Sequence, residues 1–226
     1  MLNIDTHKQQ LSKLLISLIS DKSLATKLGF KGGTALYFFE DLPRFSTDLD
    51  FDLIGEIDEK TEKIIREIVA ENLKIVDEKT KRYTWFWLGS YGNGEHKIKV
   101  EINTRRYPNH YEKRDFRGYS LKVMSKADML AHKLCAISDR RVLQNRDLYD
   151  AWWMFSKGYD VNEDIVQLRT GQKIKAYYSS LLKKIRSFPA KYDILSGLGE
   201  VMNNSQKDWV KAKLVKSLEV ELASRI

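Results

Sequence analysis

The chain has 226 residues, enough for one large domain or two small ones with a buried core. Hydrophobic residues make up 42% and charged residues 31%, and no apolar run approaches the roughly 20 residues that span a bilayer. The net charge of +8 favours polyanionic partners such as nucleotides or nucleic acid without establishing one. The single cysteine excludes an intrachain disulfide, and the N-terminus does not resemble a secretory signal. We therefore expect a cytoplasmic protein without membrane association.

Helices and strands alternate in the predicted first half of the chain. Leucines at helical spacing predict a helix over Gln10–Ile19, and a break at Gly32-Gly33 precedes a short apolar helix over Ala35–Phe39. Segments in which apolar and polar residues alternate predict the strands, and a segment with both acidic and basic residues predicts a surface helix. These elements are a strand over 48–53, a helix over Glu59–Asn72, strands over Tyr83–Leu88 and Lys97–Asn103, and a hairpin-like loop at Gly89, Gly92 and Gly94.

From Ser125 onward every predicted element is a helix. Ser125, followed by Asp128, resembles a capping box that opens a helix through Asp139. Asn145 can cap a second helix that runs to Lys157 and ends at Gly158. Further amphipathic helices are predicted around Asp164–Leu168, Ile174–Ile185 and Trp209–Leu222. The sequence thus predicts an α/β domain over 1–119 and a helical domain over 120–226 that contributes to the active-site cleft.

The acidic segment Ser46–Asp52 is the most informative part of the sequence. Asp48 and Asp50 are two residues apart on a predicted strand, so their carboxylates project from the same face. Two neighbouring carboxylates repel each other unless a cation compensates, and Mg²⁺ binds in this way together with substrate phosphates. Alone, the pair is equally typical of an edge strand with a solvated acidic face.

A glycine pair before a helix lies upstream of the aspartates. Gly32 and Gly33 allow backbone N–H groups to approach a phosphate closely, and the helix N-terminus favours an anion there. Thr34 either adds a hydroxyl contact or caps the helix. Most Gly-Gly pairs are ordinary turns, but a Gly-Gly-Thr helix start followed by Ser-x-Asp-x-Asp on a strand favours nucleotide binding.

Glu101 is the candidate third carboxylate. It alternates with apolar residues in the strand Lys97–Asn103 and faces away from the core. If this strand lies beside the strand of Asp48 and Asp50, the three carboxylates can hold metal ions that steady a triphosphate and activate an attacking hydroxyl. Without that neighbour, Glu101 is an ordinary exposed residue paired with Lys99 or Arg105.

Two later helices carry the remaining candidates. Lys133 lies beside the apolar stripe of its helix, and Arg140 continues the same side two turns later. Lys133 either extends from the rim of the core into solvent or reaches the triphosphate of a nucleotide. In the next helix Asp147 and Asp150 are neighbours at i and i+3, and Asp147 is in the first turn, where the helix dipole favours a carboxylate.

Together these residues resemble the AbiEii/AbiGii (MenT-like) toxin family of nucleotidyltransferases. The matching segments are Lys31–Leu36, Leu42–Phe51 and Arg146–Asp150, and the helix from Lys133 to Arg140 looks like the family's third motif. The resemblance covers about residues 25 to 155, and its first two segments are highly specific. The helical C-terminus carries no further match.

The resemblance implies an α+β protein with a DNA polymerase β-like nucleotidyltransferase core, in which helices flank a mixed sheet, followed by a helical domain. It implies an NTP substrate and Mg²⁺ or Mn²⁺ as cofactor. Carried over by position, Ser46 would contact the triphosphate, Asp48 and Asp50 would bind metal, and Lys133 would bind the nucleotide. An aspartate of Arg146–Asp150 would complete the site.

Family members act as toxins of toxin–antitoxin or abortive-infection pairs, some by adding nucleotides to tRNA. We therefore expect transfer of a nucleotide to RNA, with a tRNA 3′ end as acceptor and an antitoxin as partner. Two basic clusters, Arg105-Arg106 and Lys113-Arg114, are interleaved with aromatic residues and are either an RNA-contacting surface or a solvated loop. The alternatives are a transferase that modifies a protein or a small molecule, and an inactive binding partner that keeps the fold.

Overall fold

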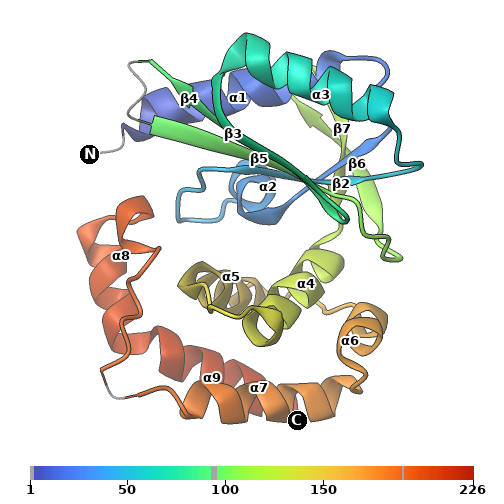
Figure 1. Cartoon of the computed structure of the whole chain (residues 1–226). Helices are drawn as coiled ribbons and strands as arrows, with labels where there is room; N and C mark the ends of the chain where they lie inside the picture. The colour runs from blue at the N-terminus through green and yellow to red at the C-terminus, as the bar shows by residue number, and fades with distance from the viewer. Residues whose placement is uncertain (1–2, 93–95, 190) are drawn as a thin grey trace. The chain divides into compact units, whose positions relative to one another are not determined.

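The computed structural model describes residues 3–92, 96–189 and 191–226. The chain divides into two compact units, Met1–Met124 and Ser125–Ile226. The first unit contains the sheet and the second is helical (Figure 1). The division falls after Met124, where the last strand of the sheet ends. The sequence predicts a boundary near Tyr119, where that strand begins.

The first unit is a mixed sheet with helices packed against it. Its elements are α1 (Ile4–Ser20), β1 (Leu28–Lys31), α2 (Gly32–Phe39), β2 (Leu49–Leu53), α3 (Glu59–Asn72), β3 (Lys74–Lys81), β4 (Thr84–Tyr91), β5 (His96–Asn103), β6 (Tyr111–Phe116) and β7 (Tyr119–Met124). The strand order is β3-β4-β5-β2-β1-β7-β6. The pairs β2–β5 and β1–β7 are parallel and the others are antiparallel. Helices α1 and α3 cover one face of this sheet (Figure 1). The α+β fold class predicted from the sequence is confirmed.

Alternation along the two central strands separates a core face from a polar face. Phe51 of β2 and Val100 of β5 are fully buried, and each such side chain contributes about 1.5–3 kcal/mol through burial. Asp50 and Glu101 are the next residues along these strands, so they project from the opposite face. The pattern that stabilises the sheet therefore also places the carboxylates on one side of it.

Four strands, β1, β3, β6 and β7, are not among the elements predicted from the sequence. Strand β3 lies at an edge of the sheet and is charged and mostly exposed, as expected for an edge that must not pair with another chain. Strands β6 and β7 form a hairpin whose turn, Arg117-Gly118, has positive φ at both residues, which suits a tight two-residue turn. Strand β1 is only four residues long and contains Gly29.

Strand β4 continues past the predicted loop start at Gly89 and ends at Tyr91. A Cβ at Gly89 would lie 2.6 Å from the Cβ of Leu73, so the glycine makes room for this side chain rather than forming a turn. Gly92 has φ of +59° and does lie in the turn, while Gly94 lies outside the described residues.

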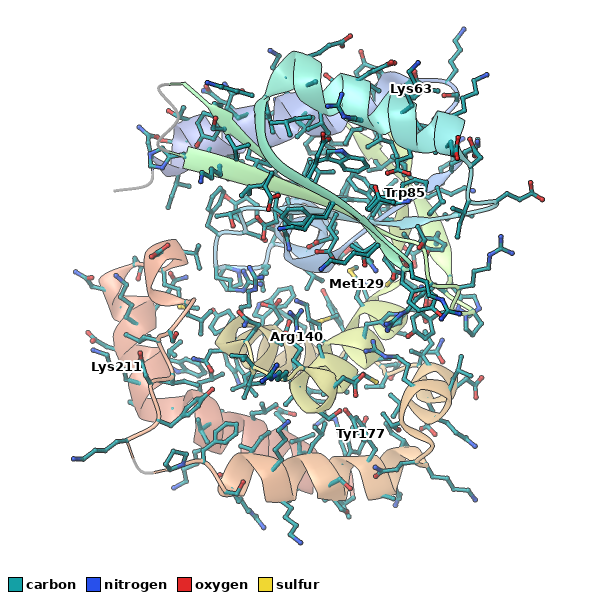
Figure 2. The ribbon with its side chains drawn as sticks, in the orientation of Figure 1. Lys63, Trp85, Met129, Arg140, Tyr177 and Lys211 are labelled. Carbon is teal, nitrogen blue, oxygen red and sulfur yellow. The ribbon has the colours of Figure 1, made fainter. Side chains whose placement is uncertain are left out.

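The second unit consists of helices. They are α4 (Lys126–Asp139), α5 (Asn145–Ser156), α6 (Glu163–Thr170), α7 (Ile174–Arg186), the 3₁₀ turn η1 (Gly199–Val201), α8 (Asn204–Trp209), the π-helical segment η2 (Val210–Leu214) and α9 (Val215–Ala223). Tyr177, labelled in Figure 2, is buried on α7 and its hydroxyl donates to the carbonyl of Leu134 on α4. This bond ties the two helices together inside the core.

Of the two helix caps predicted in this unit, Ser125 and Asn145, the first is confirmed and the second is not. Ser125 caps α4 by accepting a hydrogen bond from the N–H of Asp128. Asn145 is the first residue of α5 rather than its cap, and its side chain donates to the carbonyls of Asp193 and Ser196. The local sequence predicts a cap at Asn145 because the partners of its side chain are about fifty residues away and do not show in the local pattern.

Two further expectations concern membranes and the thiol. Within the described part of the chain, no helix is both long and apolar enough to cross a membrane. Cys135 is buried on α4, and burial raises the pKa of its thiol to about 11. It is a packing residue, since the reactive form of cysteine is the thiolate.

Candidate active site

Three carboxylates meet on the polar face of the sheet. Asp50 on β2 stands directly beside Glu101 on β5 in the parallel register, and Asp48 directly precedes β2. The strand neighbourhood on which the assignment of Glu101 depends is therefore confirmed. The cation they share is Lys99, whose Nζ lies 3.6 Å from Asp48 Oδ2, 3.9 Å from Asp50 Oδ1 and 3.4 Å from Glu101 Oε2.

The donor chemistry of this cluster fits a hard divalent cation. Carboxylate oxygens are the ligands that Mg²⁺ and Mn²⁺ take in proteins, and the three groups already converge on one positive charge. They stand around an ammonium rather than at metal-ligating separations, and among the described residues no group of three such side chains, this one included, is spaced to hold a metal ion. Asp48, Asp50 and Glu101 are thus the residues that could hold a metal.

The glycine pair packs directly on the aspartate strand. Gly32 has φ of +83°, and a Cβ there would lie 2.7 Å from Asp50 Oδ2. A Cβ on Gly33 would lie 2.7 Å from Ser46 Oγ and 2.8 Å from Arg44 Nη2. Any side chain at these positions would push the polar groups away. Close approach therefore requires glycine at both positions, and the backbone conformation requires it at Gly32 as well.

The hydroxyl of Thr34 donates to the carbonyl of Asp48. Thr34 does not cap α2, because that helix has no side-chain cap, and its buried hydroxyl makes this contact instead. The bond fastens the start of α2 to the segment that carries the first aspartate.

Arg44 is a component of this site that the sequence did not reveal. Its side chain is almost fully buried, with Nη1 donating to the carbonyl of Phe45 and Nη2 lying against Gly33. A buried guanidinium at a glycine turn places positive charge where an anion could bind. The one signal in the sequence was an arginine between Pro43 and Phe45, in an otherwise apolar context.

His7 is a second residue that the sequence did not reveal, because it lies on α1, far from the segment Ser46–Asp52. Its Nε2 is 3.0 Å from the carbonyl of Thr47, which can only accept, so Nε2 carries the proton. Nδ1 must then accept from the hydroxyl of Tyr91 at 2.7 Å. Burial lowers the pKa of His7, which keeps the ring neutral and fixes the backbone just before Asp48.

Asp52, the last aspartate of the motif, is buried and anchors a separate polar network. It accepts from Lys31, Asn103, Asn109 and Tyr111. Burial on its own would raise the pKa of Asp52, but the charge of Lys31 and these hydrogen bonds hold it below its ordinary value. The network ties β1, β5 and β6 to β2, so Asp52 links the strands that carry the carboxylate cluster to their neighbours.

In the second unit Lys133 lies between two buried aspartates. Its Nζ is 3.0 Å from Asp147 Oδ1 and 2.8 Å from Asp150 Oδ2. Arg140, near the end of α4 and labelled in Figure 2, places Nε 2.9 Å from Asp147 Oδ2 without hydrogen-bond geometry. Both aspartates thus pair with Lys133, and its ammonium is engaged inside the protein rather than projecting from the rim of the core.

The aromatic and basic residues near these motifs contact other side chains of the chain. Trp152 lies against Trp209, with ring centroids 4.1 Å apart and the rings tilted by 37°, a contact within the helical unit. Arg114 pairs with Glu40 at 2.9 Å and keeps about a third of its side chain exposed. Arg105 remains exposed and lies over the ring of Tyr83.

The structure therefore gathers the expected residues into two groups. One lies in the sheet unit and contains Gly32, Gly33, Thr34, Ser46, Asp48, Asp50 and Glu101. The other lies in the helical unit and contains Lys133, Arg140, Asp147 and Asp150.

Solved structures with the same fold are nucleotidyltransferase-type proteins. A candidate nucleotidyltransferase from H. pylori has a TM-score of 0.59 and 18% identity, covering 100% of this chain and 99% of its own. JHP933 from Helicobacter pylori has a TM-score of 0.57 and 17% identity, covering 100% and 95%. An antigenic nucleotidyltransferase-like protein from Paracoccidioides brasiliensis has a TM-score of 0.51 and 13% identity, covering 86% and 95%. The fold is that of the nucleotidyltransferases.

The family follows from the sequence itself. A model of the AbiEii nucleotidyl transferase toxin of type IV toxin–antitoxin systems matches residues 13–214. The chain belongs to this family and is a nucleotidyltransferase, which confirms the resemblance seen in the motifs. Family membership also implies an NTP substrate and a cognate antitoxin. No curated protein sequence matches the chain.

Proposed function

We propose that this chain transfers a nucleoside monophosphate from an NTP to an RNA acceptor, a tRNA 3′ end, with a divalent metal held by Asp48, Asp50 and Glu101. The observation that carries the proposal is the meeting of three carboxylates around one cation on two adjacent parallel strands. In the reaction an acceptor oxygen bonds to the α-phosphorus, the bond from that phosphorus to the bridging oxygen breaks, and pyrophosphate leaves.

The chain's own groups bind and orient the triphosphate. The close-packed turn at Gly32-Gly33 presents backbone N–H groups at the start of α2, next to the hydroxyl of Ser46 and the guanidinium of Arg44. When bound, Mg²⁺ or Mn²⁺ supplies neutralising charge to the phosphates and lowers the pKa of the attacking hydroxyl. Roles for Lys133, Arg140, Asp147 and Asp150 toward the nucleotide belong to the same proposal.

RNA as the acceptor is supported by the net charge of +8 and by exposed arginines such as Arg105 and Arg106. Both lie in the segment that follows β5, the strand of Glu101. The guanidinium groups of Arg82 and Arg105 each lie over the ring of the hairpin residue Tyr83, at 4.9 and 4.7 Å from its centroid. Rings and guanidinium groups of this kind bind single-stranded nucleic acid.

The test incubates purified protein with Mg²⁺, each labelled NTP in turn, and total RNA. Asp48→Asn and Asp50→Asn should abolish label transfer, whereas Asp77→Asn, on the exposed face of β3, should not. Label on RNA of tRNA size supports the proposal, and sequencing of the 3′ ends identifies the added nucleotide. Label on protein or on a small molecule would overturn the RNA acceptor. Absence of transfer from all four NTPs would overturn the reaction.

A further inference from the structure

Lys99 stands in the middle of the carboxylate cluster although the proposed reaction assigns it no role. It is two residues before Glu101 on β5 and therefore projects from the same face of the sheet. Its side chain is about one quarter exposed, and its ammonium is within 4 Å of carboxylates from three different residues. The position that a metal would need is thus shared with a cation of the chain itself.

The contacts of Lys99 with these three partly exposed carboxylates are longer than those of two lysines that pair with buried aspartates. Lys31 lies 2.5 Å from Asp52, and Lys133 lies 2.8 and 3.0 Å from its two aspartates. The shortest of the three contacts between Lys99 and the cluster is 3.4 Å. A close ammonium–carboxylate hydrogen bond is about 2.7–2.9 Å long, so Lys99 balances the charge of the cluster without being fixed to one member.

An ammonium held in this way can exchange with another cation. Three carboxylates on one face would repel each other without a positive charge among them. The flexible four-carbon stem of lysine allows the ammonium to leave while its backbone stays in the sheet. A divalent ion brings twice the charge and can be coordinated directly by the same oxygens.

We propose that Lys99 is an internal counter-cation that occupies the carboxylate cluster and must be displaced before a divalent metal binds there. The proposal rests on the proposed function, because it takes Asp48, Asp50 and Glu101 as the metal ligands. Its consequence is that free metal binds weakly. Metal that arrives with the triphosphate binds better, because phosphate oxygens then accept the displaced ammonium.

The experiment measures Mn²⁺ binding to the full chain by calorimetry and by electron paramagnetic resonance, without nucleotide. Lys99→Met should bind Mn²⁺ about tenfold or more tightly than the native protein, since it removes a competing charge from within 4 Å of the metal position. Lys99→Arg should stay close to the native affinity. Lys97→Met is the matched control, because Lys97 is on the same strand face but exposed and two residues further from Glu101.

Thermal unfolding gives a second measurement that does not depend on tight binding. Without metal, Lys99→Met should have a lower melting temperature than the native protein, and added Mn²⁺ should restore it. If Lys99→Met folds poorly, Lys99→Gln serves instead. Unchanged Mn²⁺ affinity in Lys99→Met, combined with loss of binding in Asp50→Asn, would overturn the role of Lys99 alone. Native Mn²⁺ affinity in Asp50→Asn would instead overturn the metal site on which the proposed function depends.

Discussion

Gly32 and Gly118 allow the contribution of the glycine turn to the metal site to be measured apart from its effect on folding. Both have positive φ, +83° and +87°. A Cβ on Gly32 would lie 2.7 Å from Asp50 Oδ2, whereas a Cβ on Gly118 would meet nothing within 4 Å. Alanine at either position therefore carries the same backbone penalty, and only Gly32→Ala disturbs the carboxylate.

The backbone penalty of alanine in the left-handed region is about 1 kcal/mol, so both variants should lose about that much free energy of unfolding. At position 32 the contact must lengthen from 2.7 Å to the 3.4 Å of ordinary van der Waals contact. The side chain of Asp50 is 29% exposed, so it can rotate away instead of destabilising the fold. A metal–oxygen bond tolerates errors of only about 0.2 Å, so Mn²⁺ affinity should fall about tenfold or more.

The assay is Mn²⁺ titration of both variants, with thermal unfolding as the check that they are equally folded. We expect similar melting temperatures and a clear difference in affinity, with Gly118→Ala at the native value. Equal Mn²⁺ affinity in the two variants would show that the turn does not set the position of Asp50, and the reasoning from close approach would be wrong.

Three further predictions concern packing, pH and the buried charges. Gly33→Ala crowds two polar atoms in a buried setting and should lower the free energy of unfolding by about 1–3 kcal/mol in denaturant titrations. Gly199→Ala, at a position with no close neighbour, should leave the free energy of unfolding unchanged. Because the pKa of Asp52 is lowered in the folded protein, its contribution to stability is present above the ordinary aspartate range and is lost as pH falls through the folded pKa. Asp52→Asn should make the free energy of unfolding less dependent on pH below about pH 4, and an unchanged pH dependence would contradict this role. Lys133→Met should cost about 3–5 kcal/mol in unfolding experiments, since it removes a cation from between two buried carboxylates, and a loss under 1 kcal/mol would show that the pairing is dispensable.

The sequence predicted the parts of the site that depend on local pattern. Alternation located the strands of Asp50 and Glu101, because each has one buried and one polar face, and their expected neighbourhood is confirmed in the parallel register. The glycine break before α2 was also visible, because the pair is followed by a short apolar segment and then by the acidic strand.

The residues that were missed act through contacts between distant segments. His7 reaches the aspartate segment from α1, and Arg44 is recognisable only by its burial against Gly33. Asp52 was visible as part of the alternation, but its partners come from three different strands and loops. Strand β3 was missed for a different reason, because an exposed, charged edge strand has no hydrophobic period to detect.

The parallel pairing of β2 with β5 has a consequence for when the carboxylate cluster can form. Paired residues of these strands are 51 positions apart, and α3, β3 and β4 lie between them in the chain. Such a contact closes a long loop and forms late compared with a hairpin such as β4–β5. On the ribosome, Asp50 is synthesised well before Glu101 but has no partner until β5 has emerged and paired. The two aspartates therefore gain Glu101 as a neighbour only after β5 has been synthesised and has paired with β2.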